Sequence, residues 1–157
     1  MKKWLSCLII ATSIVLVVVT KAGAVNYELL DVDGKIQSLD QYKGKWLVVN
    51  YWATWCGTCM KELPELISFY ENNKDKNISV VGINYENIDK NRFKEFLADK
   101  IIPYQVLSSE PIKKTPLGPV PALPTTYIID PQGEVVAGSI GIVTRQDLEN
   151  YIKHKKG

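Results

Sequence analysis

The stretch Trp52–Cys59, with the sequence WATWCGTC, decides the fold because two cysteines stand two residues apart between an apolar run and a helical pattern. A Cys-x-x-Cys pair at the start of a helix can close a small disulfide. Unsatisfied backbone N–H groups and the positive end of the helix dipole favour the thiolate of the first cysteine and lower its pKa. The stretch therefore predicts a redox-active dithiol formed by Cys56 and Cys59.

Two other uses of paired cysteines, haem attachment and zinc binding, lack the residues that they need. A c-type haem site has a histidine directly after the second cysteine, and Met60 stands there. A structural zinc site needs four ligands, but the only further cysteine is Cys7 and the only histidine is His154. We therefore expect no metal and no organic cofactor.

The N-terminal segment has the pattern of an export signal. Lys2 and Lys3 precede a run from Trp4 to Thr20 without charged residues, and the small residues Ala22-Gly23-Ala24 follow as a cleavage site. We expect residues 1–24 to be a signal peptide and the protein to reach the periplasm or the outer face of the inner membrane. An uncleaved membrane anchor is the alternative, because the run is close to the lower length limit for a bilayer span.

Removal of residues 1–24 changes the composition that bears on function. Cys7 is lost, and the loss of three lysines leaves 16 basic against 17 acidic residues, so the net charge changes from +2 to −1. No basic stripe remains to indicate nucleic-acid binding. Residues 25–157 suit one domain with one core. Because Cys56 and Cys59 are then the only cysteines, they are expected to serve chemistry and not a disulfide scaffold.

Strand and helix patterns alternate along residues 25–157, which predicts an α/β domain. The continuous apolar run Trp46–Trp52 is typical of a central strand that is covered on both faces. Five prolines between Pro111 and Pro124 predict a long rigid connection without regular structure. The other predicted elements are a hairpin over 27–30 and 35–37, strands over 78–83, 104–107, 127–129 and 134–136, and helices over 56–70, 92–100 and 145–154, the last with Thr144 as N-cap.

Residues 50–59 (NYWATWCGTC), with Glu62 and Pro64 after them and LPTTYIID at 123–130, resemble the extracytoplasmic thioredoxin-like proteins of the TlpA/ResA type in bacteria. The resemblance extends from Tyr27 to the C-terminus. It implies a three-layer thioredoxin-like fold with a central mixed sheet and an N-terminal β-hairpin extension. The family's Cys-x-Pro-Cys form is altered here, because Thr58 takes the place of the proline.

The resemblance also implies the activity, which is thiol-disulfide exchange with the disulfides of partner proteins. Cys56 is expected to be the exposed nucleophile and Cys59 the shielded resolving thiol, with reduction of the partner as the direction. A membrane electron donor would return the dithiol to its reduced form, and cytochrome c maturation is one process that such a protein serves. A disulfide oxidase or isomerase of the same fold is an alternative, and a Cu(I)-binding or delivery module that uses both thiolates is another.

Further site residues are expected from the same resemblance. Glu62 would be the base for Cys59, with a pKa raised by burial, because Asn50 stands where thioredoxins have an aspartate. The alternative for Glu62 is an exposed carboxylate that pairs with a lysine. Pro124 would be the cis-proline that faces the dithiol. The residues expected to face the substrate are Trp55, Gly57, Thr58 and Leu123, whereas Trp52 is expected in the core.

Overall fold

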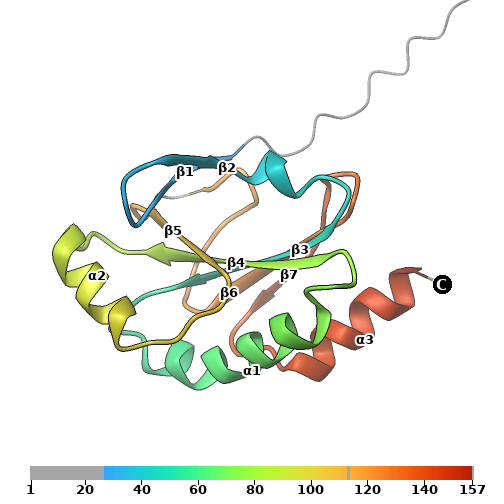
Figure 1. Ribbon diagram of the computed structural model, residues 1–157. Coiled ribbons are helices and arrows are strands. Elements are labelled where there is room, and N and C mark those ends of the chain that lie inside the picture. The colour runs from blue at the N-terminus through green and yellow to red at the C-terminus, as the bar shows by residue number, and fades with distance from the viewer. Residues whose placement is uncertain (1–26, 113, 157) are drawn as a thin grey trace, which may run out of the picture.

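The computed structural model describes residues 27–112 and 114–156, so the predicted signal peptide lies outside the described residues. They form one seven-stranded sheet in the order β2-β1-β5-β4-β3-β6-β7, with three α-helices and one 3-10 helix (Figure 1). The elements in chain order are β1 (Glu28–Asp31), β2 (Ile36–Ser38), η1 (Leu39–Tyr42), β3 (Trp46–Trp52), α1 (Gly57–Asn73), β4 (Ile78–Tyr85), α2 (Lys90–Ala98), β5 (Gln105–Ser109), β6 (Thr125–Ile129), β7 (Val135–Ile140) and α3 (Arg145–Lys156).

The sheet is mixed, as the sequence predicted. β3 pairs in parallel with β4, and β4 pairs in parallel with β5. Each of these parallel steps needs a long crossover, which α1 and α2 supply. The other neighbouring strands pair antiparallel, including the N-terminal hairpin of β1 and β2 and the pair of β6 and β7.

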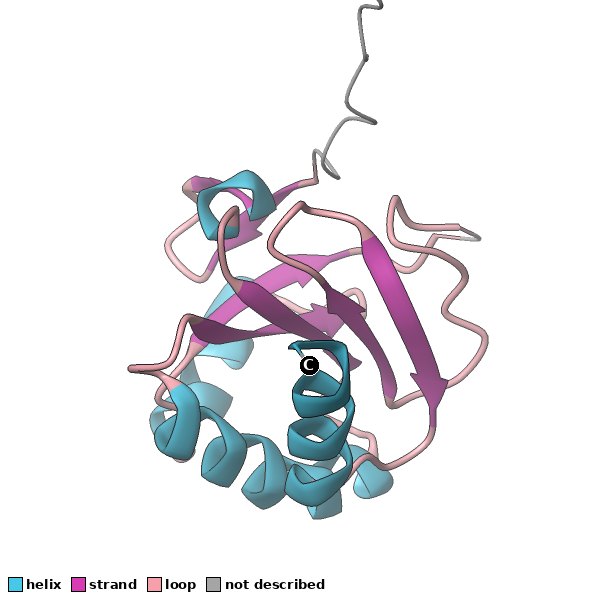
Figure 2. Cartoon of the chain, turned by 90° about the vertical axis from the view of Figure 1, so that its right-hand side faces the viewer, coloured by secondary structure: helices cyan, strands magenta, loops and turns pink. Residues whose placement is uncertain are grey.

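The strand β3 divides the core into two layers, because its side chains alternate between the two faces of the sheet. All seven of its residues are buried. Val48 packs with Leu66 and Phe69 of α1 and with Leu148 and Ile152 of α3. Figure 2 shows the long helices on this side of the sheet, whereas the short η1 lies on the other side.

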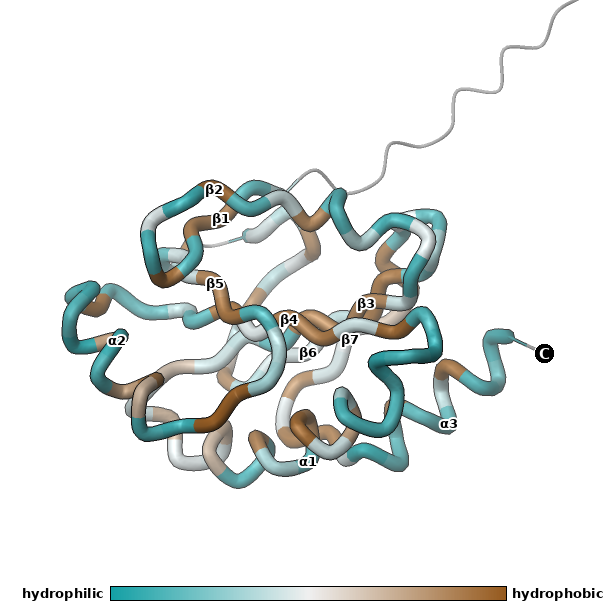
Figure 3. Tube along the Cα trace, viewed as in Figure 1, coloured by the Kyte–Doolittle hydropathy of each residue, from teal (hydrophilic) through white to brown (hydrophobic). Residues whose placement is uncertain are grey.

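The opposite face of the sheet is covered without an α-helix. Leu47, Val49 and Tyr51 of β3 pack in a cluster with Leu39 of η1, the hairpin and the proline-rich connection between β5 and β6. In the hydropathy view of Figure 3, the strands carry most of the hydrophobic colour, whereas the connections and the end of α3 are mostly hydrophilic. This face is therefore covered by η1, the irregular proline-rich connection and the hairpin at the edge of the same sheet.

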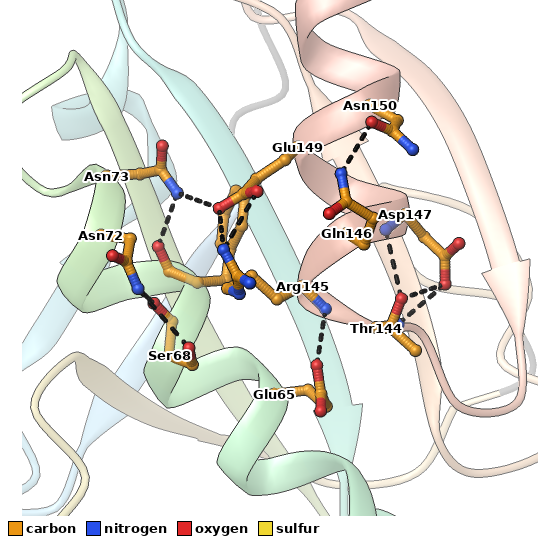
Figure 4. A network of polar contacts seen from close by, with 11 residues as sticks. Glu65, Ser68, Asn72, Asn73, Thr144, Arg145, Gln146, Asp147, Glu149 and Asn150 are labelled. Atoms are coloured by element: carbon orange, nitrogen blue, oxygen red, sulfur yellow. Dashed lines mark hydrogen bonds and ion pairs between the residues drawn. The ribbon is translucent and has the colours of Figure 1, made fainter.

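The C-terminal helix α3 is fixed to α1 by polar contacts at its first turns (Figure 4). Thr144 and Asp147 form a reciprocal cap, in which the Asp147 amide donates to Thr144 Oγ1 over 3.2 Å and the Thr144 amide donates to the Asp147 carboxylate over 3.0 Å. The Arg145 amide donates to Glu65 Oε2 of α1 over 2.9 Å. The predicted N-cap Thr144 is confirmed.

The predicted elements are all present, with differences at their ends. α1 continues through Pro64 to Asn73, and β7 extends to Ile140, beyond the predicted end at Val136. Among residues 27–112 and 114–156, no helix has the length and apolar character needed to cross a bilayer.

Candidate functional site

The two cysteines lie at the start of α1, shortly after the end of β3, and they are joined by a disulfide with an S–S distance of 2.05 Å. Cys56 is the N-cap of α1, and its Sγ accepts a hydrogen bond from the Cys59 amide over 3.1 Å. The first helical amides have no partner inside the helix, so they can stabilise negative charge on this sulfur. The arrangement suits a thiolate at Cys56.

The exposed fractions of the two cysteines do not distinguish their roles, although the sequence predicted an exposed Cys56 and a shielded Cys59. Cys56 is 5% exposed and Cys59 is 3% exposed, so the expectation of an exposed Cys56 is wrong for the disulfide form. Both cysteines belong to a small apolar cluster that also includes Trp52 of β3 and Phe93 of α2. The difference between them is positional, because only Cys56 occupies the cap of α1.

Glu62, one helical turn after Cys59, has no exposed surface. Its Oε1 accepts the Val143 amide over 2.8 Å, and its Oε2 accepts Asn50 Nδ2 over 2.8 Å. Burial raises the pKa of this carboxyl above its usual value, and the hydrogen bonds from Val143 and Asn50 oppose part of that shift. The alternative of an exposed carboxylate paired with a lysine is therefore excluded.

Asn50 links the dithiol helix to the strand that follows the proline-rich connection. Its Nδ2 atom also donates to Thr126 Oγ1 of β6 over 2.9 Å, and the residue is buried. Asn50 supplies no titrating group, so Glu62 is the ionisable side chain that this network holds.

The peptide bond Leu123–Pro124 is cis, as expected from the resemblance. Pro124 is buried at the start of β6 and Leu123 is half-buried in the apolar cluster of the dithiol. Thr58 connects this segment to the cysteines, because its Oγ1 lies 3.3 Å from Cys56 Sγ and 3.5 Å from the Leu123 carbonyl oxygen. A disulfide sulfur carries no proton, so the hydroxyl is the group that can donate to it.

The two tryptophans of the motif have different surroundings. Trp55 is 71% exposed, and Gly57 and Thr58 beside it are exposed as well. Trp52 is buried and packs against the rings of Phe93 and Phe96 of α2, so its predicted place in the core is confirmed. The exposed surface next to the disulfide is thus formed by Trp55, Gly57 and Thr58.

Sequence reasoning missed two partners of the site. The Val143 amide is a backbone group and has no side-chain signature. Glu86 lies 32 residues after Thr54, and its carboxylate accepts the Thr54 amide over 2.7 Å. A carboxylate directly after a buried strand was the only signal for Glu86, and it is a weak one. In the part of the chain that the structure describes, no group of three or more His, Cys, Asp or Glu side chains could hold a metal ion.

Comparison with known proteins gives a consistent result. Residues 20–137 match the model of the AhpC/TSA family. The chain is 34% identical over 133 residues to the thiol-disulfide oxidoreductase ResA of Bacillus thuringiensis subsp. konkukian, and the match covers 83% of this chain and 75% of that protein.

Solved structures agree with this match. A DsbF homologue from Corynebacterium diphtheriae has a TM-score of 0.73 at 30% identity, covering 86% of this chain and 87% of that one. A thioredoxin-family thiol:disulfide interchange protein from Chlorobium tepidum has a TM-score of 0.70 at 27% identity, covering 85% of this chain and 95% of that one. The resemblance drawn from the sequence is confirmed, and the fold is thioredoxin-like.

Proposed function

Because the chain belongs to the AhpC/TSA family and is a thiol-disulfide oxidoreductase of thioredoxin fold, we propose that it reduces disulfides of partner proteins outside the cytoplasm. The observation that supports the proposal best is the Cys56–Cys59 disulfide at the start of α1, with the buried Glu62 one turn further along. With Cys56 as the nucleophile, Cys59 as the second thiol and Glu62 as the base, all three groups would act at the N-terminal end of one helix.

The proposed reaction transfers two electrons from the dithiol to the partner. The Cys56 thiolate attacks one sulfur of the partner disulfide, the S–S bond of the partner breaks, and its other sulfur leaves and takes up a proton. Cys59, deprotonated by Glu62, then attacks Cys56 Sγ. The mixed disulfide breaks, the second partner thiol is released, and the Cys56–Cys59 disulfide forms.

The surroundings of the disulfide suit an extended partner segment. Trp55, Gly57 and Thr58 offer exposed surface, and Leu123, with the cis-proline Pro124 directly after it, packs against the cluster that holds both cysteines. Proline has no backbone N–H, so Pro124 leaves its neighbours free to pair with the partner's main chain. We assign these five residues to partner contact.

Export is the second part of the proposal. Residues 1–24 act as a signal peptide or as a membrane anchor, and residues 25–157 form the thioredoxin-like domain in the periplasm or at the outer face of the inner membrane. There the oxidised dithiol needs a source of electrons, which we assign to a membrane protein.

Equilibration with glutathione tests the direction. A reductase should have a potential near that of thioredoxin, about −270 mV, and should reduce insulin with dithiothreitol as the electron source. A potential near about −120 mV, with oxidation of a reduced partner, would identify an oxidase instead. Tight Cu(I) binding without disulfide exchange would favour the copper module. In cells, Cys59→Ala should trap partners on Cys56, and the Cys56→Ala Cys59→Ala double variant is the control.

A further inference from the structure

Glu86 binds the loop between β3 and α1 through both oxygens of its carboxylate. It directly follows β4, and its Oε1 accepts the Thr54 amide over 2.7 Å while its Oε2 accepts the Thr54 hydroxyl over 3.2 Å. Asn84 Nδ2 donates to the same Oε1 over 2.7 Å. One half-buried carboxylate thus holds both the main chain and the side chain of a residue two positions before Cys56.

The contact extends the pairing of the two central strands beyond their last backbone partners. The parallel register of β3 and β4 ends at Trp52 opposite Asn84. Asn84 is fully buried, so packing holds its side-chain amide in position, and this amide orients the Glu86 carboxylate through the hydrogen bond to Oε1. Beyond this last pair of the strands, the Glu86 carboxylate accepts the Thr54 amide, as a backbone carbonyl would do within the sheet.

Thr54 lies inside the turn that delivers Cys56 to the helix. The Cys56 amide donates to the Ala53 carbonyl over 3.1 Å, so residues 53–56 form one turn with Thr54 at its second position. The turn fixes where Cys56 caps α1 and where its Sγ meets the Cys59 amide. We propose that Glu86 is a positioning residue for thiol-disulfide exchange, which holds this turn and thereby places Cys56. The proposal rests on the proposed function.

A pair of variants separates hydrogen bonding from charge. In Glu86→Gln the side-chain oxygen can still accept the Thr54 and Asn84 N–H groups, and its NH₂ group can donate to the Thr54 hydroxyl. In Glu86→Ala all three hydrogen bonds are lost. Both variants lack the negative charge, so a difference between them reports the loss of the side chain and its hydrogen bonds and not the loss of charge.

Two measurements on the reduced protein test the proposal. Amide exchange of Thr54 should be at least about tenfold faster in Glu86→Ala than in Glu86→Gln, because the amide loses its acceptor. Alkylation of Cys56 by iodoacetamide, located by mass spectrometry, should have its pH midpoint about half a unit or more higher in Glu86→Ala, with a rate at pH 7 about threefold or more lower.

Asp130→Ala is the matched control. Asp130 is also a half-buried carboxylate that accepts two backbone N–H groups, from Gln132 and Glu134, but it lies at the opposite end of β6 from Pro124. It should leave the Cys56 profile unchanged.

Equal Cys56 profiles in the two Glu86 variants would overturn the proposal, and so would an equal change in Asp130→Ala. Neither measurement uses a protein substrate. Failure of the wild-type protein to exchange with any disulfide would therefore refute the proposed function. The effect of Glu86 on Thr54 and Cys56 would still be measured separately.

Discussion

At the scale of single residues, the dithiol depends on a carboxyl that water cannot reach. Glu62 is held by the Asn50 amide and the Val143 amide, and it has no exposed surface. The pKa of Tyr104 is raised above the usual tyrosine range, mainly by burial of Tyr104 and also by the negative charge of Glu62. Because Glu62 is buried, its ionisation costs free energy in the folded protein that it does not cost in the unfolded chain.

Glu62→Gln should change how stability depends on pH. The folded-state pKa of Glu62 is raised, so its contribution to stability is fully present below the unfolded value of about 4.5 and is lost as pH rises through the folded pKa. Urea unfolding of the oxidised protein at several pH values should show this loss in the wild type and a flatter profile in the variant. The same variant should slow resolution of a mixed disulfide. Identical pH profiles for both proteins would remove Glu62 from the role of base.

Thr58→Pro should lower the reduction potential by some tens of millivolts, where about 30 mV corresponds to roughly 1.4 kcal/mol for the two-electron couple. The Thr58 hydroxyl lies 3.3 Å from Cys56 Sγ and can donate to a thiolate, which stabilises the reduced form. Proline removes both this donor and the backbone N–H. Equilibration of both proteins with glutathione measures the difference. An equal or higher potential in the variant would show that other residues, such as Glu62 or Leu123, set the potential.

At the scale of elements, patterns within one segment predicted more than contacts between segments. The continuous apolar run Trp46–Trp52 predicted β3, and local patterns over 78–83 and 56–70 predicted β4 and α1. The end of β7 was missed because Gly138 and Ser139 have no strand pattern. The reason for a glycine at position 138 lies on the neighbouring strand, because the ring of Tyr127 would be 2.9 Å from a Cβ placed there. Glu86 was missed for the same reason, since its partner lies on another element.

Thr144→Ala should lower the free energy of unfolding by about 1 kcal/mol, the usual cost of losing an N-cap. The side chain accepts the Asp147 amide, and α3 covers one face of the sheet through Leu148 and Ile152. Chemical denaturation measures the change. Gln146→Ala is the control on the same helix, because it removes only the exposed contact with Asn150 and should cost less than about 0.5 kcal/mol. Equal effects of the two substitutions would mean that the cap does not stabilise α3.

At the scale of the whole molecule, the described residues hold the Cys56–Cys59 site, and we expect residues 1–24 to determine where in the cell it works. The site lies at the N-terminal end of α1, whereas α3 ends at the other side of the molecule (Figure 1). The composition of residues 25–157 predicted one domain and a chemical role for its two cysteines. It could not predict the direction of electron flow, because that depends on a potential set by several contacts around one sulfur.

The mature protein should begin at Val25 or close to it. The small residues Ala22-Gly23-Ala24 match the pattern of a cleavage site, and the uncharged run before them is short for a stable bilayer span. Mass spectrometry of the protein from fractionated cells measures its N-terminus. A protein that keeps residues 1–24 and sediments with the membrane would be anchored, with its domain on the same outer side.

The complete burial of β3 also determines where this protein can be engineered. All seven of its residues are buried, six in apolar clusters and Asn50 in hydrogen bonds to Glu62 and Thr126, so a substitution anywhere along the strand disturbs contacts that the fold needs. The turn that follows and the first residues of α1 are less constrained on their outer side, where Trp55, Gly57 and Thr58 are exposed. A combinatorial library that varies these three positions and leaves the strand untouched should therefore yield mostly folded proteins that differ in partner preference.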